Sequence, residues 1–404
     1  MEIKEDLKKL CEFVRPPGSK GEKEAAFWLK ECFEKIGLKT SIEEFKYHGF
    51  FGSSLALHVF LAVLCLLIPY NLSQLIGLGW NGLSIITTFL LIFISISYAG
   101  ECTGRFIWLR NILPIKHSQN VIGKLTQNYS SEKKRKTIII SGHYDAPRAG
   151  IIFHPFVVKN LGGKIAPLSI PFKQILIITV LKATEIFYPF LNSKFIYIIY
   201  ILKIIVIILA LITIILLLQY ELSPPVQGAS DNASGIIVSM AVAEILKNNP
   251  PYNSDIWILG SGSEEAHLIG MIEFIKKHKT ELDKENTYFI TMDTLGSGTP
   301  KYCESEGFMI KQYYPDQTLV KIAKNISAQE EFKDFSVTHI SGHTDALISA
   351  LSGYKSINLI GLDEKHKPKF YHWYNDTPEN INYKLLEKFR DFTVKLVEYI
   401  DKKL

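Results

Sequence analysis

The residues that could do chemistry in this chain are histidines and acids, and each lies near the end of a predicted strand or the start of a helix. Two of them are adjacent glutamates, and two form a His-x-Asp pair after an apolar strand. The set is His143, Asp145, Asp231, Glu264, Glu265, Asp293 and His372. Imidazole and carboxylate ligands without thiolates suit hard to borderline divalent cations, zinc above all.

Each of these motifs alone also has a purely structural explanation. Asp231, between small residues, could simply cap a helix, and the Glu264–Glu265 pair could favour a helix dipole. Chemistry alone does not separate His372 from His343, which lies nearby in the sequence, as do His339 and His366. Taken together, the motifs predict two divalent ions, with one carboxylate bridging them and three protein ligands on each ion.

The elements that must position these residues alternate between helices and strands. The predicted helices cover 22–36 and begin at 233 and 264; the predicted strands are 40–45, 120–125, 137–141, 255–259 and 288–292. Such alternation is typical of an α/β fold with a mainly parallel, mixed sheet sandwiched by helices. We predict one catalytic domain, made of residues 1–50, 101–151 and 223–404, that is interrupted by two helical membrane hairpins, 51–100 and 152–222.

The two predicted hairpins account for much of the 47% hydrophobic content. No Asp, Glu, Lys or Arg occurs between Tyr47 and Gly100, which is enough chain for two crossings, with a turn at 69–73. In the second tract Ile204–Tyr220 is uncharged, whereas Lys182 and Glu185 interrupt the first half. These two residues are three apart and could pair on one helix face. An amphipathic helix at the interface is the alternative for Ile175–Leu191.

The metal prediction restricts how the chain crosses a membrane. His143 precedes the second hairpin and Asp231 follows it, so the hairpin must cross an even number of times if both residues reach one site. We therefore expect four spans in an integral membrane protein. Cations flank the catalytic side of the spans more densely than the far side, which places the catalytic domain in the cytosol. The cations compared are Lys39, Lys46, Arg105, Arg110, Lys116, Lys159, Lys164 and Lys173 on the catalytic side, against Lys194 and Lys203 on the far side.

Composition excludes several other classes. The net charge of +5 is too balanced for a nucleic-acid partner. Five cysteines without a C-x-x-C pair predict neither a disulfide framework nor a thiolate zinc site. The charged start of the chain does not resemble a signal peptide. The expected partners are a peptide substrate and the lipid bilayer, and the sequence makes no prediction of the oligomeric state.

The order of the motifs and their local amino-acid sequences resemble those of the co-catalytic zinc exopeptidases of peptidase family M28. This family includes aminopeptidases, glutamate carboxypeptidases and glutaminyl cyclases. The resemblance covers nearly all of the predicted catalytic domain and none of the membrane tracts. It implies two zinc ions per chain. His143 and Asp293 would hold one ion, Glu265 and His372 the other, and Asp231 would bridge both.

The same resemblance implies three catalytic roles. Glu264 matches the general base, Asp145 the partner that orients the first ligand histidine, and Tyr371 a tyrosine that stabilises the tetrahedral intermediate in some members. It also implies a cis peptide bond after the bridging Asp231. The segment 341–346, Ser-Gly-His-Thr-Asp-Ala, differs from the family's usual Ser-Asp-His sequence. The residues that form the substrate subsites are therefore not predicted.

The predicted function is that of a membrane-anchored, zinc-dependent exopeptidase, and surplus negative charge near the metals would favour an aminopeptidase. The alternatives are a carboxypeptidase or dipeptidase, a glutaminyl cyclase-like enzyme on the same fold, and an inactive membrane scaffold. Residue preference and the physiological substrate stay open.

Overall fold

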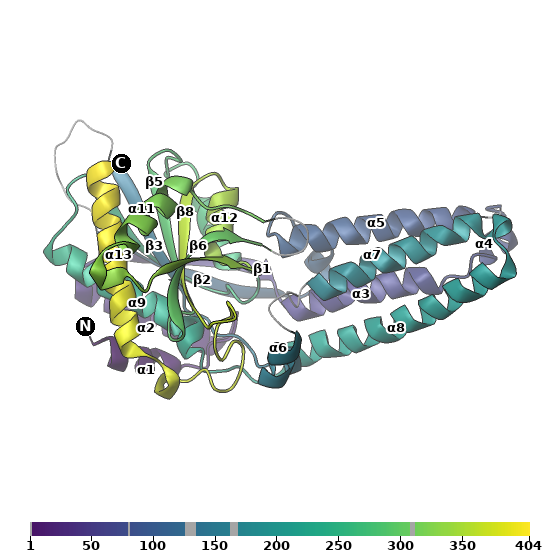
Figure 1. Ribbon diagram of the computed structural model, residues 1–404, viewed down its shortest axis with the longest axis horizontal. Coiled ribbons are helices and arrows are strands. Elements are labelled where there is room, and N and C mark those ends of the chain that lie inside the picture. Colours follow the sequence, from purple (N-terminus) through teal and green to yellow (C-terminus); the bar gives the residue numbers. More distant parts are fainter. Residues whose placement is uncertain (1, 80, 126–134, 162–168, 308–311) are drawn as a thin grey trace.

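The computed structural model describes residues 2–79, 81–125, 135–161, 169–307 and 312–404. It has two parts, an α/β domain and a long helical bundle that projects from one side of it (Figure 1). Both termini lie on the α/β domain, at the end away from the bundle. The bundle is built from the two apolar insertions, and the α/β domain from the three segments between and around them.

A mixed sheet of eight strands forms the centre of the α/β domain, in the order β1-β2-β4-β3-β5-β8-β6-β7. Its inner strands β4, β3, β5 and β8 run parallel to one another, while β1, β2 and β6 introduce the antiparallel pairs. The prediction of a mainly parallel mixed sheet is therefore confirmed. The strands are β1 Lys39–His48, β2 Ile115–Leu125, β3 Lys136–His143, β4 Ser254–Ser261, β5 Thr287–Asp293, β6 Thr299–Glu306, β7 Ser336–Ile340 and β8 Lys355–Leu362.

Helices cover both faces of this sheet because alternate side chains of each central strand point to opposite sides. Ile138 and Ile140 of β3 pack in one core with the helices α1, α2, α9, α11 and α13, whereas Ile139 packs in a second core with α10 and α12. These helices are α1 Ile3–Cys11, α2 Lys20–Ile36, α9 Ser234–Asn248, α10 Ile269–His278, α11 Gln317–Ser327, α12 Asp345–Leu351 and α13 Tyr383–Lys403. The predicted sandwich is confirmed.

One predicted helix start is wrong. The structure begins α10 at Ile269, five residues after Glu264, and the residues between form turns. Ser263, His267 and Leu268 have positive φ angles there, which the helical conformation excludes.

The helical bundle consists of α3 Phe51–Leu67, α5 Gly82–Cys102, α7 Ser169–Ala183 and α8 Ser193–Leu222, with the short helix α4 Leu72–Leu75 and the turn η3 Thr184–Phe190 at its far end (Figure 1). By length and composition, α5 and α8 are each apolar enough to cross a membrane, while α3 is a shorter apolar helix. The helices bury one shared apolar core and leave many Leu, Ile and Phe side chains exposed along the outside.

Charged side chains lie inside the bundle near its far end. Lys182 Nζ is 2.7 Å from Glu185 Oε2, and Lys203 Nζ donates to the other oxygen of the same carboxylate. All three residues are buried. The predicted pairing of Lys182 with Glu185 is confirmed, and the structure adds Lys203 as a second cation.

Candidate metal centre

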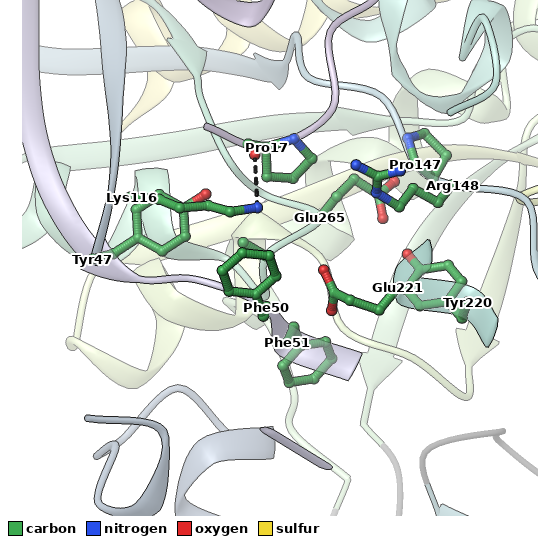
Figure 2. Close-up of a pocket in the computed structure, with 11 residues that line it drawn as sticks. Pro17, Tyr47, Phe50, Phe51, Lys116, Pro147, Arg148, Tyr220, Glu221 and Glu265 are labelled. Carbon is green, nitrogen blue, oxygen red and sulfur yellow. Dashed lines mark hydrogen bonds between the residues drawn. The ribbon is translucent and has the colours of Figure 1, made fainter. Parts of the chain in front are cut away.

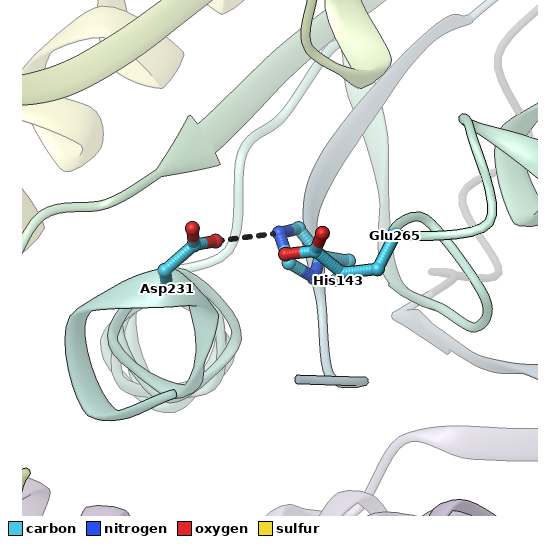
Figure 3. Close-up of side chains that lie close together, drawn as sticks. All are labelled: His143, Asp231 and Glu265. Carbon is cyan, nitrogen blue, oxygen red and sulfur yellow. Dashed lines mark ion pairs between the residues drawn. The ribbon is translucent and has the colours of Figure 1, made fainter. Parts of the chain in front are cut away.

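The candidate centre lies where strands β3, β4 and β5 end. His143 is the last residue of β3, and the turn after β4 carries Glu265. Together with Asp231 these residues form a group that could hold a metal ion, since each offers one ligand atom and those atoms lie within 4.8 Å of one another. Figure 3 shows Asp231 facing the His143 ring across an ion pair, with the Glu265 carboxylate beside the ring and overlapping it in this view. The carboxyl ends of parallel strands meet at one edge of a sheet, which explains this convergence.

Asp231 lies between the two candidate imidazoles. Its Oδ1 is 3.3 Å from His143 Nε2 and its Oδ2 is 3.3 Å from His372 Nε2. The peptide bond to Asn232 is cis, as the family resemblance implies. The Asp376 carboxylate accepts hydrogen bonds from the backbone nitrogens of Ser230 and Asp231, at 2.6 and 3.0 Å. Asp231 is thus held where it could bridge two cations.

The adjacent glutamates are fixed by Asp145. One Asp145 oxygen accepts from the backbone nitrogen of Glu264 and the other from that of Glu265, each at 3.0 Å. The carboxylate also lies 3.4 Å from His143 Nδ1. The positive φ angles of His267 and Leu268 interrupt helical geometry after the glutamates, and the helix begins only at Ile269. The same carboxylate therefore contacts both the first imidazole and the glutamate pair.

His372 completes the group from the C-terminal part of the chain. Its Nε2 lies 3.4 Å from Glu265 Oε2, in addition to its contact with Asp231. Aromatic rings pack on the imidazole: Phe153 at 4.5 Å and Tyr220 at 6.0 Å between ring centroids. Both rings come from the second insertion, so the base of the helical bundle touches a candidate ligand directly. His343, the rival by chemistry, lies instead 5.9 Å from the His267 ring.

Asp293 and Tyr371 are the two remaining predicted site residues. Asp293 ends strand β5. Burial, followed by the nearby Asp231 carboxylate, raises its pKa well above the ordinary value. The Tyr371 ring lies 4.0 Å from the His372 ring, and a third of the residue is exposed. Both residues are near the group, and their roles in metal binding and catalysis stay predictions.

The electrostatics show a shortage of positive charge. Burial, and then the neighbouring Glu265, raise the pKa of Glu264 well above its usual range despite the His143 ring. Burial opposes a charge on His143, but Glu264, Asp145 and Asp231 outweigh it and raise the pKa of that imidazole. Carboxylates buried together are unfavourable unless cations compensate them. Asp231 Oδ2 also has no hydrogen-bond partner among the described residues. The donor set therefore fits divalent metal ions.

The sequence analysis gave no role to two buried acids that support this site. Asp376, four residues after His372, was not singled out. Glu22 Oε1 accepts from the backbone nitrogen and hydroxyl of Ser263, at 2.7 and 2.9 Å. The Ser19-x-x-Glu22 spacing is a capping-box pattern, which predicts that Glu22 lies in the first turn of helix α2. Nothing in that spacing indicates the contact with Ser263, which depends on the tertiary fold.

Comparison with known proteins agrees with this arrangement. Residues 217–397 match the family model described as Peptidase family M28. The chain is 25% identical over 181 residues to Aminopeptidase YwaD of Bacillus subtilis (strain 168), an alignment that covers 44% of this chain and 39% of that protein. The matched part thus spans about two fifths of the length of this curated relative.

Solved structures show the same fold across the chain. A zinc aminopeptidase from Bacillus subtilis aligns with TM-score 0.55 at 14% identity, covering 98% of this chain and 93% of that one. A Zn-dependent exopeptidase from Parabacteroides distasonis aligns with TM-score 0.54 at 10% identity, covering 100% and 97%. A Bacteroides thetaiotaomicron glutaminyl cyclase bound to N-acetylhistamine aligns with TM-score 0.53 at 14% identity, covering 98% and 96%.

Residues 217–397 are therefore similar to peptidase family M28, and the solved structures show that the chain has the fold of the zinc exopeptidases.

Proposed function

We propose that this protein is a zinc-dependent exopeptidase anchored in a membrane, and specifically an aminopeptidase. The observation that carries the proposal is the position of Asp231, whose two oxygens each lie 3.3 Å from a different imidazole. A carboxylate between two ligand sets is the arrangement that a pair of cations requires. The aminopeptidase named above, similar in sequence, supports the choice of reaction.

Two zinc ions per chain are the proposed cofactors. His143 and Asp293 would hold one ion, Glu265 and His372 the other, with Asp231 shared between them. When bound, such ions lower the pKa of a coordinated water and polarise a carbonyl group.

Glu264 is the proposed general base. Its Oε2 lies 3.8 Å from His143 Nε2, at the edge of the ligand group, and its backbone is fixed by Asp145. It would take a proton from the attacking water and return it to the leaving amine. Tyr371 is a further donor to the developing oxyanion in this proposal.

An excess of carboxylates around the centre supports the aminopeptidase. A free α-ammonium group would be stabilised by this negative charge, whereas the carboxylate terminus of a substrate would be repelled from the same position. The substrate therefore presents its N-terminus to the metal centre.

We propose that the chain crosses the membrane four times. The four spans are α3, α5, α7 together with η3, and α8. This proposal is supported by apolar side chains exposed around the bundle, such as Phe60, Phe89, Val180 and Ile208, since patches of this extent mark membrane or protein contacts. The even number of crossings also keeps His143 and Asp231 on one side. Cations near the catalytic end favour a cytosolic catalytic domain.

Metal analysis of the purified full-length protein, combined with a screen of aminoacyl and N-blocked peptides, tests this function. We expect about two zinc ions per chain and hydrolysis of peptides with a free N-terminus only. Hydrolysis of N-blocked peptides would support the carboxypeptidase alternative, cyclisation of N-terminal glutamine the cyclase, and zinc binding without any turnover the inactive scaffold. Protection of the catalytic domain from protease in intact cells tests the cytosolic orientation.

A further inference from the structure

A cleft separates the metal centre from the base of the helical bundle. It is narrow and partly open to solvent. Glu265 lines it from the side of the metal centre, and Phe50, Phe51, Tyr220 and Glu221 line it from the ends of α3 and α8 (Figure 2). The cleft therefore continues from the candidate active site toward residues that belong to the insertions.

Two cations and one further carboxylate line the same cleft without pairing. In the described parts of the chain, none of Lys116, Arg148 and Glu221 makes an ion pair within 4 Å. Lys116 Nζ donates to the Pro17 carbonyl at 3.4 Å and lies 4.1 Å from the centre of the Phe50 ring. Arg148 donates one hydrogen bond, to the Ser223 carbonyl at 2.5 Å. Most donors of both cations are thus uncommitted.

The charge in this part of the cleft is suited to an anion. Apart from Glu265, which the metal centre would use, Lys116 and Arg148 outweigh Glu221 by one positive charge. Burial lowers the pKa of Lys116, so its charged form lacks full compensation. An arriving carboxylate would supply that compensation through charge-assisted hydrogen bonds, which a guanidinium can form in pairs.

The size and walls of the cleft limit what can enter. The space that a water-sized molecule can reach inside it is about 30 Å³, far below the range for whole small-ligand sites. The cleft therefore has room for a small terminal group such as a carboxylate, and the rings of Phe50, Phe51 and Tyr220 stand at the bundle side. A peptide whose scissile bond lies at the metal centre would have room for only a short remainder before it meets these rings.

We propose that Lys116 and Arg148 bind the free C-terminal carboxylate of the substrate, so that the enzyme acts on short peptides, with di- and tripeptides as the substrate class. This inference rests on the proposed exopeptidase function. The C-terminal carboxylate of the substrate would then lie on the bundle side of the cleft, and its N-terminal ammonium group would lie at the carboxylates of the metal centre.

The test compares the best di- or tripeptide from the peptide screen with its C-terminal amide, using the zinc-loaded full-length protein in detergent micelles. We expect kcat/KM to be about tenfold to a hundredfold higher for the free acid, because hydrogen bonds to charged groups contribute that much. Lys116→Met and Arg148→Gln should each reduce this preference through KM, and Lys116→Arg should restore it. Lys46→Met and Arg105→Gln, which change exposed cations near the same end of the bundle, are the matched controls and should leave it unchanged.

Calorimetric binding of both peptides to the metal-loaded Glu264→Gln variant separates this inference from the proposed function. Tighter binding of the free acid without hydrolysis by wild type would support the carboxylate site and overturn the exopeptidase. Equal kcat/KM and equal affinity for acid and amide, with hydrolysis intact, would overturn the carboxylate site alone. Unchanged preference in both cleft variants would also overturn it.

Discussion

The α/β domain and the helical bundle place their polar and apolar side chains in opposite ways. Inside the α/β domain the large core is built mainly of Ile, Val, Leu and Phe side chains, and buried acids gather at the site. The bundle buries Ser54, His58, Ser97 and the Lys182–Glu185–Lys203 group, yet exposes Leu, Ile and Phe along its length. The two parts thus differ in the kinds of side chain that they bury and expose.

This difference indicates that buried polar groups have a different role in each part. In a lipid environment apolar contact alone does not hold helices together, and interhelical polar contacts between small or hydroxyl residues add to packing. His58 Nε2 contacts Ser97 Oγ at 3.0 Å, and Ser84 Oγ donates to Glu185 at 2.8 Å, both across helices. The α/β domain uses buried polar groups to position reacting groups, while the bundle uses them to join its helices.

Substitutions of the adjacent glutamates Glu264 and Glu265 in the α/β domain should have the largest effect on activity. Glu264→Gln removes the proposed base and should lower kcat by about 10²–10⁴-fold while zinc content stays unchanged. Glu265→Gln should instead lower the zinc content, since it removes a proposed ligand. Glu273→Gln on helix α10 is the matched control. Activity near wild type in Glu264→Gln would remove this residue from the mechanism.

In the bundle, the corresponding test is Glu185→Gln, which leaves two buried ammonium groups without their shared carboxylate. We expect the free energy of unfolding in detergent micelles to fall by about 3–5 kcal/mol, with kcat of the folded fraction unchanged. Lys194→Met, at an exposed position near the start of α8, is the control. A loss no larger than that of the control would contradict the role of the buried group in joining the helices.

A smaller effect is expected for Asp145→Asn, which changes a residue that supports the site. The amide keeps one acceptor but cannot accept from both Glu264 and Glu265 as the carboxylate does, so we expect metal affinity or kcat/KM to fall about 10–100-fold. Asp391→Asn, at a partly exposed position, should have no such effect. Zinc titration and steady-state kinetics measure both variants.

The smallest effect is expected for an ion pair on the surface of the α/β domain. Lys388 Nζ lies 2.6 Å from Asp334 Oδ2, with both side chains about a third or more exposed. Lys388→Met should change the free energy of unfolding by about 0–1 kcal/mol, since water screens the pair. Comparison with Glu185→Gln in the same micelles shows whether burial in the bundle is what makes that group important. A loss equal to that of Glu185→Gln would refute this explanation.

Residues at the ends of strands were predictable from the sequence because parallel strands bring their carboxyl ends together. His143 and Glu265 follow from this rule, whereas Asp231, which lies just before helix α9, follows from the family resemblance, and the predicted cis bond after it is present. The start of α10 was not predictable, since nothing in the local pattern indicates the positive φ angles of Ser263, His267 and Leu268 that delay the helix to Ile269.

Contacts between distant segments escaped prediction for the same physical reason. The packing of Phe153 and Tyr220 on His372 joins the second insertion to the C-terminal loop, and no local pattern specifies such a contact. The additional cation Lys203 also lies on a different helix from Lys182. Periodicity and spacing report what is near in sequence, whereas these contacts depend on how the finished elements pack.

The connections between the two parts are short at critical points. Strand β1 ends at His48 and α3 begins at Phe51, while α8 ends at Leu222, next to cleft residues Tyr220 and Glu221. Only two residues separate β1 from α3, and residues of α8 itself line the cleft, so the cleft lies directly at the junction of the two parts. If the bundle spans a bilayer as proposed, the reacting groups would lie close to the lipid headgroups, and the enzyme would meet peptides in that thin layer.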